Sequence, residues 1–194
     1  MLSDDLKKIL KGDVDTSEAA LDKASRDASL FEMRPQVVVF PKDSADVQAL
    51  VRYVSEHKTR GSDSDPALSI TARAAGTCMS GGSLNESIIM DTTRYMTGVL
   101  AVNASEKWAK VLPGTYYRDF DTETKKVGLI MPAYTASREL CTVGGMVANN
   151  SGGEKSIYYG KTERYIRELK VVFHDGYEYI VRPMTRKELM LKIG

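Results

Sequence analysis

A glycine-rich stretch between two short apolar runs is the part of this sequence best suited to hold an anion. It extends from Arg73 to Ser83 and contains three glycines and four small residues with a hydroxyl or thiol group. Leu68 to Ala72 before it and Ile88 to Asp91 after it have the pattern of short strands. A loop of this composition leaves many backbone N–H groups unpaired, and such groups can converge on a phosphate.

Two common phosphate motifs do not explain this stretch. Gly76 to Ser83 has the glycine spacing of a P-loop, but Gly82 stands where the phosphate-binding lysine is required, which disfavours a nucleoside triphosphatase. A dinucleotide fingerprint opens a helix, whereas the apolar run after this stretch predicts a strand. Taken alone, the stretch is equally typical of a long surface loop that tolerates glycines.

A second small-residue stretch, Cys141 to Gly153, favours a ligand. Two Gly-Gly pairs flank an apolar trio and the pair Asn149-Asn150. Glycine pairs permit positive φ and close approach of the backbone to a ligand, and asparagine offers both donors and acceptors. The structural alternative is a turn and a bulge around a buried strand, Met146 to Ala148. Two such stretches in one chain predict a large ligand held from two sides.

The order of these motifs resembles the flavin-binding domain of the FAD-linked oxidases, the vanillyl-alcohol oxidase or PCMH type. Within that family it is most similar to the D-lactate and glycolate dehydrogenase branch. Ala74 and Ala75 depart from the family's pyrophosphate loop, R-G-G-G-T-x-x-S-G. The matching positions run in order along the chain: Arg26 to Ser29, Pro35, Val37 to Lys42, Arg73 to Gly82, Pro132, Ser137, Thr142 to Gly153, Gly160, Val171-Val172 and Asp175-Gly176.

The resemblance implies an α+β fold in which a small βαβ lobe precedes a larger, mostly antiparallel lobe. It also implies that the chain is truncated at its C-terminus, because family members continue into a further flavin-contacting segment and a substrate cap. We expect an N-terminal helical segment over residues 1–34, a first FAD-binding lobe over 35–113 and an incomplete second lobe over 114–194.

The implied cofactor is noncovalently bound FAD. In the family a 2-hydroxy acid, such as D-lactate or glycolate, gives a hydride to flavin N5 while a base takes the hydroxyl proton. The substrate residues are expected beyond Gly194, so no catalytic residue and no electron acceptor is assigned. The cofactor-binding residues implied by the motifs are Ala75, Gly76, Thr77, Cys78, Met79, Ser80, Gly81, Pro132, Ser137, Thr142, Gly144, Gly145, Asn149 and Gly152.

Two other functions fit the same motifs. One is a flavoenzyme on the same domain that resembles the NADPH-dependent enolpyruvyl-sugar reductases, and the other is a noncatalytic domain with vestigial flavin loops. A metal site is not expected, because His57 and His174 lie far apart and neither has a neighbouring cysteine or carboxylate pair. Cys141 is the first residue of the second stretch and could form a covalent bond to a flavin. Its position is, however, one residue away from that of the cysteine in family members that bind the flavin covalently.

Composition narrows the partners and the compartment. The net charge of +1 gives no electrostatic basis for binding nucleic acid or a membrane surface. The sequence lacks an apolar run long enough to span a bilayer, and its N-terminus does not resemble a signal peptide. Its two cysteines are too few for a disulfide framework, so a cytoplasmic location is expected.

Periodicity and capping residues predict the elements that carry these stretches. Helices are expected from Asp4 to Leu10, after Ser17, from Asp43 or Ser44 to His57, and from Tyr116 to about Lys126 with Thr115 as its cap. Strands are expected at residues 36–41, 68–72, 88–91, 99–102 and 108–112, and a hairpin at 169–181. Thr185 and Glu188 form a capping box before a last helix.

Overall fold

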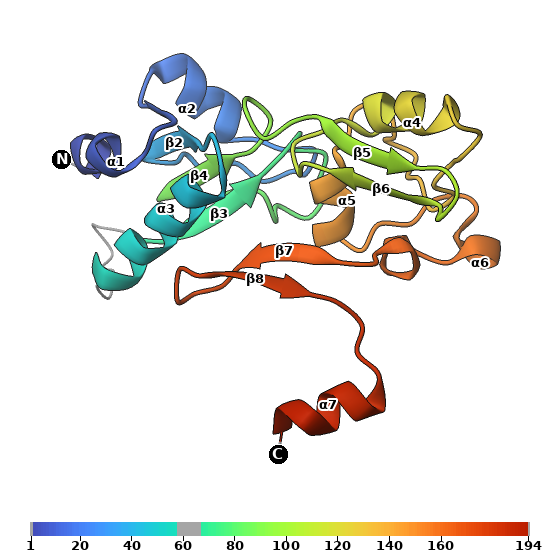
Figure 1. The fold of residues 1–194 in the computed structure, drawn as a ribbon. Helices are drawn as coiled ribbons and strands as arrows, with labels where there is room; N and C mark the ends of the chain where they lie inside the picture. Colours follow the sequence, from blue (N-terminus) through green and yellow to red (C-terminus); the bar gives the residue numbers. More distant parts are fainter. Residues whose placement is uncertain (1, 58–66, 194) are drawn as a thin grey trace.

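The computed structural model describes residues 2–57 and 67–193, and the polar turn predicted for residues 59–66 lies outside them. Within this part, a sheet of order β1-β2-β4-β3 forms the first half of the molecule (Figure 1). β2 and β3 both run parallel to β4, as the predicted β-α-β unit requires, and β1 pairs antiparallel with β2. The strands are β1 (Asp13–Asp15), β2 (Val37–Phe40), β3 (Ile70–Arg73) and β4 (Ile88–Asp91).

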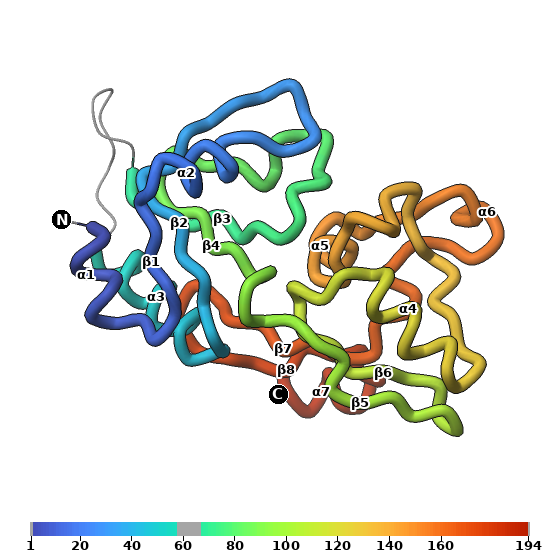
Figure 2. Tube along the Cα trace, turned by 90° about the horizontal axis from the view of Figure 1, so that it is seen from above, coloured from blue at the N-terminus to red at the C-terminus, as the bar shows by residue number. Residues whose placement is uncertain are grey.

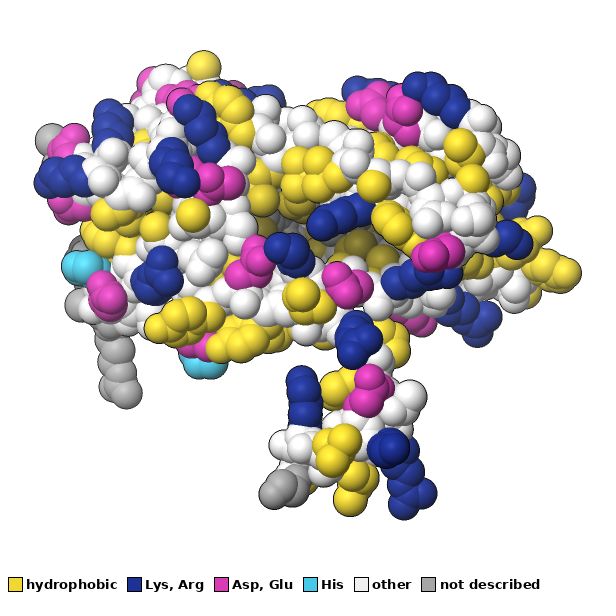
Figure 3. Space-filling model, in the orientation of Figure 1, with side chains coloured by type: hydrophobic (Ala, Val, Ile, Leu, Met, Phe, Trp, Pro, Cys, Tyr) yellow, Lys and Arg dark blue, Asp and Glu magenta, His cyan; other side chains and the backbone are white. Residues whose placement is uncertain are grey.

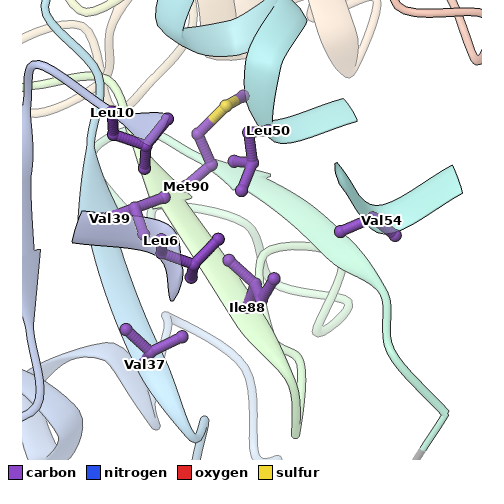
Figure 4. Packing of buried hydrophobic residues seen from close by; sticks show 8 residues of the cluster. All are labelled: Leu6, Leu10, Val37, Val39, Leu50, Val54, Ile88 and Met90. Carbon is purple, nitrogen blue, oxygen red and sulfur yellow. The ribbon is translucent and has the colours of Figure 1, made fainter. Parts of the chain in front are cut away.

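Helices cover both faces of this sheet. The central strands β2 and β4 are buried along their whole length, which is why they read as continuous apolar runs. α1 (Leu2–Ile9) and α3 (Ser44–His57) cover one face, and α2 (Glu18–Ala24) covers the other. Figure 4 shows the first of these two clusters, which contains Leu6, Leu10, Val37, Val39, Leu50, Val54, Ile88 and Met90.

The second half has its own smaller core. The hairpin of β5 (Val99–Asn103) and β6 (Trp108–Val111) packs against α4 (Tyr117–Lys125) and α5 (Val143–Ala148). The predicted boundary at residue 113 stays a prediction, although β5 and β6 pack with this second cluster. The cluster consists of Tyr117, Phe120, Cys141, Val143 and Met146.

The predicted C-terminal hairpin connects the two halves. β7 (Leu169–Val172) and β8 (Glu178–Val181) pair antiparallel and run below both halves in Figure 1. Arg52 of α3 donates to the carbonyl of Gly176 at 3.1 Å, and Arg167 donates to the carbonyl of Glu106 at 2.7 Å. α6 (Ser156–Tyr159) and the 3₁₀ helix η1 (Thr162–Tyr165) precede the hairpin.

The last helix, α7 (Arg186–Ile193), projects away from the body and buries none of its residues (Figure 1). Hydrophobic side chains gather on α7 and over the β7–β8 hairpin in the space-filling view (Figure 3). The predicted capping box is confirmed, because the Thr185 hydroxyl accepts from the Glu188 amide at 3.3 Å and the Glu188 carboxylate accepts from the Thr185 amide at 2.8 Å.

Two local predictions are wrong. The sequence analysis places only helices before residue 30, but Asp13–Asp15 pairs with β2 as a three-residue strand. Tyr116, not Thr115, is the N-cap of α4, and it makes no side-chain cap bond. The Thr115 hydroxyl instead accepts from the Gly98 amide at 2.8 Å. This contact holds the start of β5 against the turn before α4, so the hydroxyl is not free to cap the helix.

A buried carboxylate closes the turn between α1 and β1. Asp46 of α3 is 1% exposed and accepts from the backbone amides of Lys11, Gly12 and Lys42 at 2.9–3.0 Å. Its own amide donates to Asp43 at 3.1 Å, which confirms Asp43 as a cap of α3. One side chain therefore fixes the approach to β1 and the end of β2 against α3.

A buried arginine fixes the loop after β3. The guanidinium of Arg73 donates to the carbonyls of Lys23, Ala24 and Arg26 at 3.5, 3.3 and 2.6 Å. Carbonyls at the end of a helix have no partner within the helix, so Arg73 caps the C-terminal end of α2. The glycine-rich stretch therefore leaves the sheet from a point that is tied to α2.

We predict that Asp46→Ala lowers the free energy of unfolding by about 3 kcal/mol, because three backbone amides lose their acceptor in a buried place. Urea denaturation of the two proteins measures this difference. Asp5→Asn is the control, since Asp5 only forms an exposed ion pair with Lys8 and its loss should leave the midpoint nearly unchanged. Equal midpoints for Asp46→Ala and the wild type would contradict the role given to Asp46.

We predict that Arg73→Met destabilises the chain by about 1–3 kcal/mol, because the α2 carbonyls lose their donor. Arg73→Lys should recover only part of this loss, since an ammonium cannot reproduce the planar fork of donors. Hydrogen exchange locates the effect: the amides of Ser25 and Ala28, which donate to the carbonyls of Leu21 and Gly76 at 2.9 and 3.1 Å, should exchange faster in Arg73→Met than in the wild type. Unchanged exchange at these two amides would show that Arg73 does not hold the loop against the end of α2.

Candidate functional site

The first predicted stretch folds as a loop whose shape requires glycine at two positions. Gly76 and Gly81 have φ values of 68° and 75°, in the left-handed region. A Cβ at Gly76 would also clash with the Arg73 guanidinium, and one at Gly81 would meet the Phe31 ring at 3.0 Å. The sequence-based expectation of a strand–loop–strand context is confirmed by β3 and β4 on either side.

The amides near the start of this loop are open. Those of Ala75, Gly76 and Thr77 donate no hydrogen bond within the part of the chain that the structure describes. The Gly76 carbonyl, in contrast, accepts from the Ala28 amide at 3.1 Å and so ties the loop to the entry segment. Open amides beside a fixed carbonyl are suited to bind an anion.

The far side of the loop is organised internally. The thiol of Cys78 lies 3.1 Å from the Ser80 hydroxyl. Hydrogen bonds from the Ser80 hydroxyl and amide and from the Gly82 amide lower the pKa of Cys78, and partial burial opposes this. Met79 is 82% exposed. These residues shape the loop, and Ser80 is already engaged by its neighbour.

Two charged groups anchor the loop to the residues before β2. Burial lowers the pKa of the Arg73 guanidinium, and the carboxylates of Asp91 and Asp27 oppose that shift. Asp27 accepts from the Ser29 amide at 2.8 Å and from the Ser83 hydroxyl at 3.0 Å. Burial raises the pKa of Asp27, but these hydrogen bonds outweigh it and the net pKa is lowered. Asp27 therefore holds the end of the loop in its ionised form.

The second predicted stretch folds as a helix, so the structural alternative of a buried strand at Met146 to Ala148 is excluded. Residues 143–148 form α5, and none of the glycines at 144, 145, 152 and 153 has the positive φ that glycine permits. The Thr142 hydroxyl is buried and caps α5 by accepting from the Gly145 amide at 3.2 Å. The Val143 and Gly144 amides donate to the carbonyls of Thr115 and Pro113, both at 2.9 Å. The first amides of α5 are thus paired.

Close approach, the other property expected of these glycines, is confirmed. A Cβ at Gly144 would lie 2.6 Å from the Pro113 carbonyl oxygen, so any side chain there would push α5 away from the 113–115 segment. A Cβ at Gly153 would clash with the Tyr134 carbonyl. At Gly152 it would clash with Ser156, whose hydroxyl accepts from the Gly153 amide at 2.7 Å.

The fold brings the two stretches together. A Cβ at Gly145 would meet only Thr142 Oγ1 at 3.2 Å and the Ala74 side chain at 4.0 Å. α5 therefore faces the start of the loop after β3, and Figure 2 shows the two segments side by side. Ala74 and Gly145 are far apart in the sequence, and the absence of large side chains at both lets the two segments approach each other closely.

A pocket of about 480 Å³ opens between the two halves of the chain. The loop after β3 supplies one wall and the region around Tyr116 supplies another. Of the predicted cofactor residues only Ala75, Gly76 and Thr77 line it, whereas the sequence analysis missed Tyr116, Arg118 and Leu140. Its lining is Arg26, Asp27, Ala28, Arg73, Ala75, Gly76, Thr77, Tyr116, Arg118 and Leu140.

A second pocket, of about 300 Å³, is lined by none of the predicted cofactor residues, although Ala136 and Arg138 in its lining flank Ser137 in sequence. The Ser137 hydroxyl is 3.0 Å from the Thr135 hydroxyl, and Pro132 is half-buried nearby in sequence. The exposed Asn149 donates to the Ser151 hydroxyl at 3.3 Å. The lining is Tyr134, Thr135, Ala136, Arg138, Glu139 and Glu154.

Other chemistry finds no support among the described residues. No group of three or more His, Cys, Asp and Glu side chains in residues 2–57 and 67–193 could hold a metal ion. His57 stacks on Tyr53 in α3, and His174 lies in the exposed turn of the β7–β8 hairpin. None of the helices in this part of the chain has both the length and the apolar character needed to cross a bilayer.

Comparison with curated proteins gives relatives of one enzymatic type. The chain is 30% identical over 174 residues to the D-2-hydroxyglutarate dehydrogenase of Haemophilus influenzae, which covers 89% of this chain and 16% of that protein. It is 32% identical over 142 residues to the D-lactate dehydrogenase of Archaeoglobus fulgidus, covering 72% of this chain and 29% of that protein. The chain thus spans less than a third of either relative.

Comparison with solved structures supports the fold. The 6-hydroxy-D-nicotine oxidase of Arthrobacter nicotinovorans superposes with a TM-score of 0.74 at 22% identity, over 93% of this chain and 38% of that one. The model of the FAD binding domain family matches residues 35–181, which include both glycine-rich stretches and both pockets' principal walls. The chain belongs to the FAD binding domain family.

Proposed function

We propose that this chain is the FAD-binding part of a flavin-dependent dehydrogenase that oxidises a 2-hydroxy acid. The observation that carries the proposal is the meeting of the loop after β3 with α5, at Ala74 and Gly145, beside a pocket with open amides. The relatives named as D-2-hydroxyglutarate and D-lactate dehydrogenases support the substrate class. Noncovalent binding is supported by Cys141, which is 3% exposed and contacts the Thr135 hydroxyl at 3.5 Å.

The residues present fit a ligand with an anionic end and a flat apolar end. The amides of Ala75, Gly76 and Thr77 would hold the diphosphate, since they have no partner in the described part of the chain. The close-packed glycines of α5 and of residues 152–153, with Pro132 and Ser137, would border the ring. These assignments of individual residues are part of the proposal.

The protein's part in the reaction is to bind and orient. When bound, FAD would supply a two-electron acceptor for the oxidation of the hydroxy acid. The anchors at Arg73 and Asp27 fix the loop before any ligand arrives, which reduces the entropy that binding must overcome. The cytoplasmic location stays a prediction, and no electron acceptor and no single 2-hydroxy acid is assigned.

FAD binding tests the proposal directly. A protein of the relatives' full length that contains this chain should take up FAD, seen as a change in flavin absorbance and fluorescence on titration, whereas this chain alone should bind FAD weakly or not at all. Bleaching of the bound flavin under anaerobic conditions by D-2-hydroxyglutarate, D-lactate or glycolate, in a protein of the relatives' full length that contains this chain, tests the substrate class. A full-length protein that ignores added FAD would refute the proposal.

We predict that Gly145→Val weakens FAD binding by at least tenfold, because its side chain would press on Ala74 and move the loop after β3 away from α5. The helix should tolerate the change, since Gly145 has an ordinary helical conformation and meets no backbone atom. Ala104→Val, in the exposed turn between β5 and β6, is the control and should bind FAD like the wild type. Equal affinity for Gly145→Val and the wild type would place the ligand elsewhere.

A further inference from the structure

The larger pocket carries more positive than negative charge. Three arginines and one aspartate line it, namely Arg26, Arg73, Arg118 and Asp27. The fixed charges of the lining therefore leave an excess of two positive charges, which equals the negative charge of a diphosphate. Charge of this sign beside the open amides of Ala75 to Thr77 indicates an anionic ligand.

Two of the three arginines are already committed. Arg73 donates to three carbonyls at the end of α2, the shortest at 2.6 Å. Arg26 forms two bonds of 3.1 Å with the carboxylate of Glu32. Both contribute to the field in the pocket, but Arg73 directs its donors to backbone carbonyls and the charge of Arg26 is neutralised by Glu32.

Among the described residues, Arg118 has no carboxylate within hydrogen-bonding distance. Its Nη1 donates to the Glu139 carbonyl, and no other hydrogen bond from this guanidinium is found within the described residues. Its distance to the nearest carboxylate oxygen, on Asp119, is 3.9 Å, and its side chain is 44% exposed. The charge is therefore reachable from the pocket and only weakly neutralised.

The position of Arg118 is fixed by its surroundings. The guanidinium lies over the ring of Tyr116, 4.2 Å from the ring centroid. Tyr116 forms a β-bridge with Thr142, and the Tyr117 amide donates to the Cys141 carbonyl at 2.9 Å. Arg118 is thus held to the start of α5, in the wall across from the loop after β3.

We propose that Arg118 supplies the charge-assisted contact to the diphosphate of FAD, from the wall across from the amides of Ala75, Gly76 and Thr77. This inference rests on the proposed function and assigns a binding residue outside both glycine-rich stretches. The two walls then hold the diphosphate differently: one with backbone dipoles, the other with a guanidinium, which suits two oxygens at once.

The test compares ligands that do and do not carry a diphosphate. Arg118→Gln should weaken the binding of FAD and of ADP by about tenfold and leave riboflavin unchanged, because riboflavin has no phosphate. Arg118→Lys should keep part of the affinity. Arg182→Gln removes a similar charge outside the pocket, where Arg182 pairs with Glu188 at 3.3 Å, and should bind like the wild type.

Salt and a second variant keep the test independent of folding. FAD affinity of the wild type should fall more steeply with salt than that of Arg118→Gln, since the variant has lost one charge facing the ligand. Tyr116→Leu leaves the charge but removes the ring that positions it, so it should weaken FAD and ADP and spare riboflavin. Circular dichroism confirms that each variant is folded.

The outcomes separate the two proposals. Equal FAD affinity for Arg118→Gln and the wild type, or an equal loss for riboflavin and FAD, would overturn the role of Arg118 and leave the proposed function standing. A full-length wild-type protein that does not bind FAD at all would overturn the proposed function itself. Loss confined to FAD and ADP would establish Arg118 as a diphosphate-binding residue.

Discussion

The geometry of the site depends on one buried guanidinium. Arg73 ends β3, and its side chain reaches the carbonyls of Ala24 and Arg26 at the end of α2. A buried arginine is costly unless its donors are satisfied, and helix-end carbonyls are strong acceptors that need partners of their own. The interaction therefore satisfies both groups, and it fixes the point from which the glycine-rich loop starts. Gly76 follows from it, since a side chain there would occupy the space of the guanidinium.

Backbone pairing builds the opposite wall around α5, and Arg118 supplies the charge of that wall. The carbonyls of Pro113 and Thr115 accept the first amides of α5, and the close contact of Gly144 with Pro113 lets the two segments approach. As a result the first amides of α5 are not available to a ligand, whereas those of Ala75, Gly76 and Thr77 in the loop after β3 are. The two walls are chemically unequal: one offers backbone donors to an anion, and the other offers a close-packed surface beside a single guanidinium. A ligand that joins a diphosphate to a flat ring system matches this inequality.

The sequence predicts the parts of the fold whose signal is local. These include the helix caps at Ser17 and Thr185, the apolar runs of β2 and β4, and the hairpin at 169–181. Each of them depends on residues that are close in the chain. Contacts between residues distant in the chain are not predicted in this way. The Thr115 hydroxyl, for example, accepts from the Gly98 amide, and the periodicity of the sequence does not identify that partner. The helix α5 could not be predicted for a similar reason: two adjacent glycines argue against a helix, and Gly144 is explained by its contact with Pro113, which is distant in the sequence. Arg118 lies in a helix whose own pattern indicates a solvated face.

The chain is similar to relatives that are named for different substrates. The Haemophilus influenzae and Archaeoglobus fulgidus relatives are named for different 2-hydroxy acids, yet both match this chain over most of its length. Under the proposed function, the loop after β3 and α5 serve the cofactor. Discrimination between a long dicarboxylic substrate and a short one requires groups at a different distance from the ring. Selection of the hydroxy acid therefore needs side chains that face it, apart from the two walls that would position the cofactor.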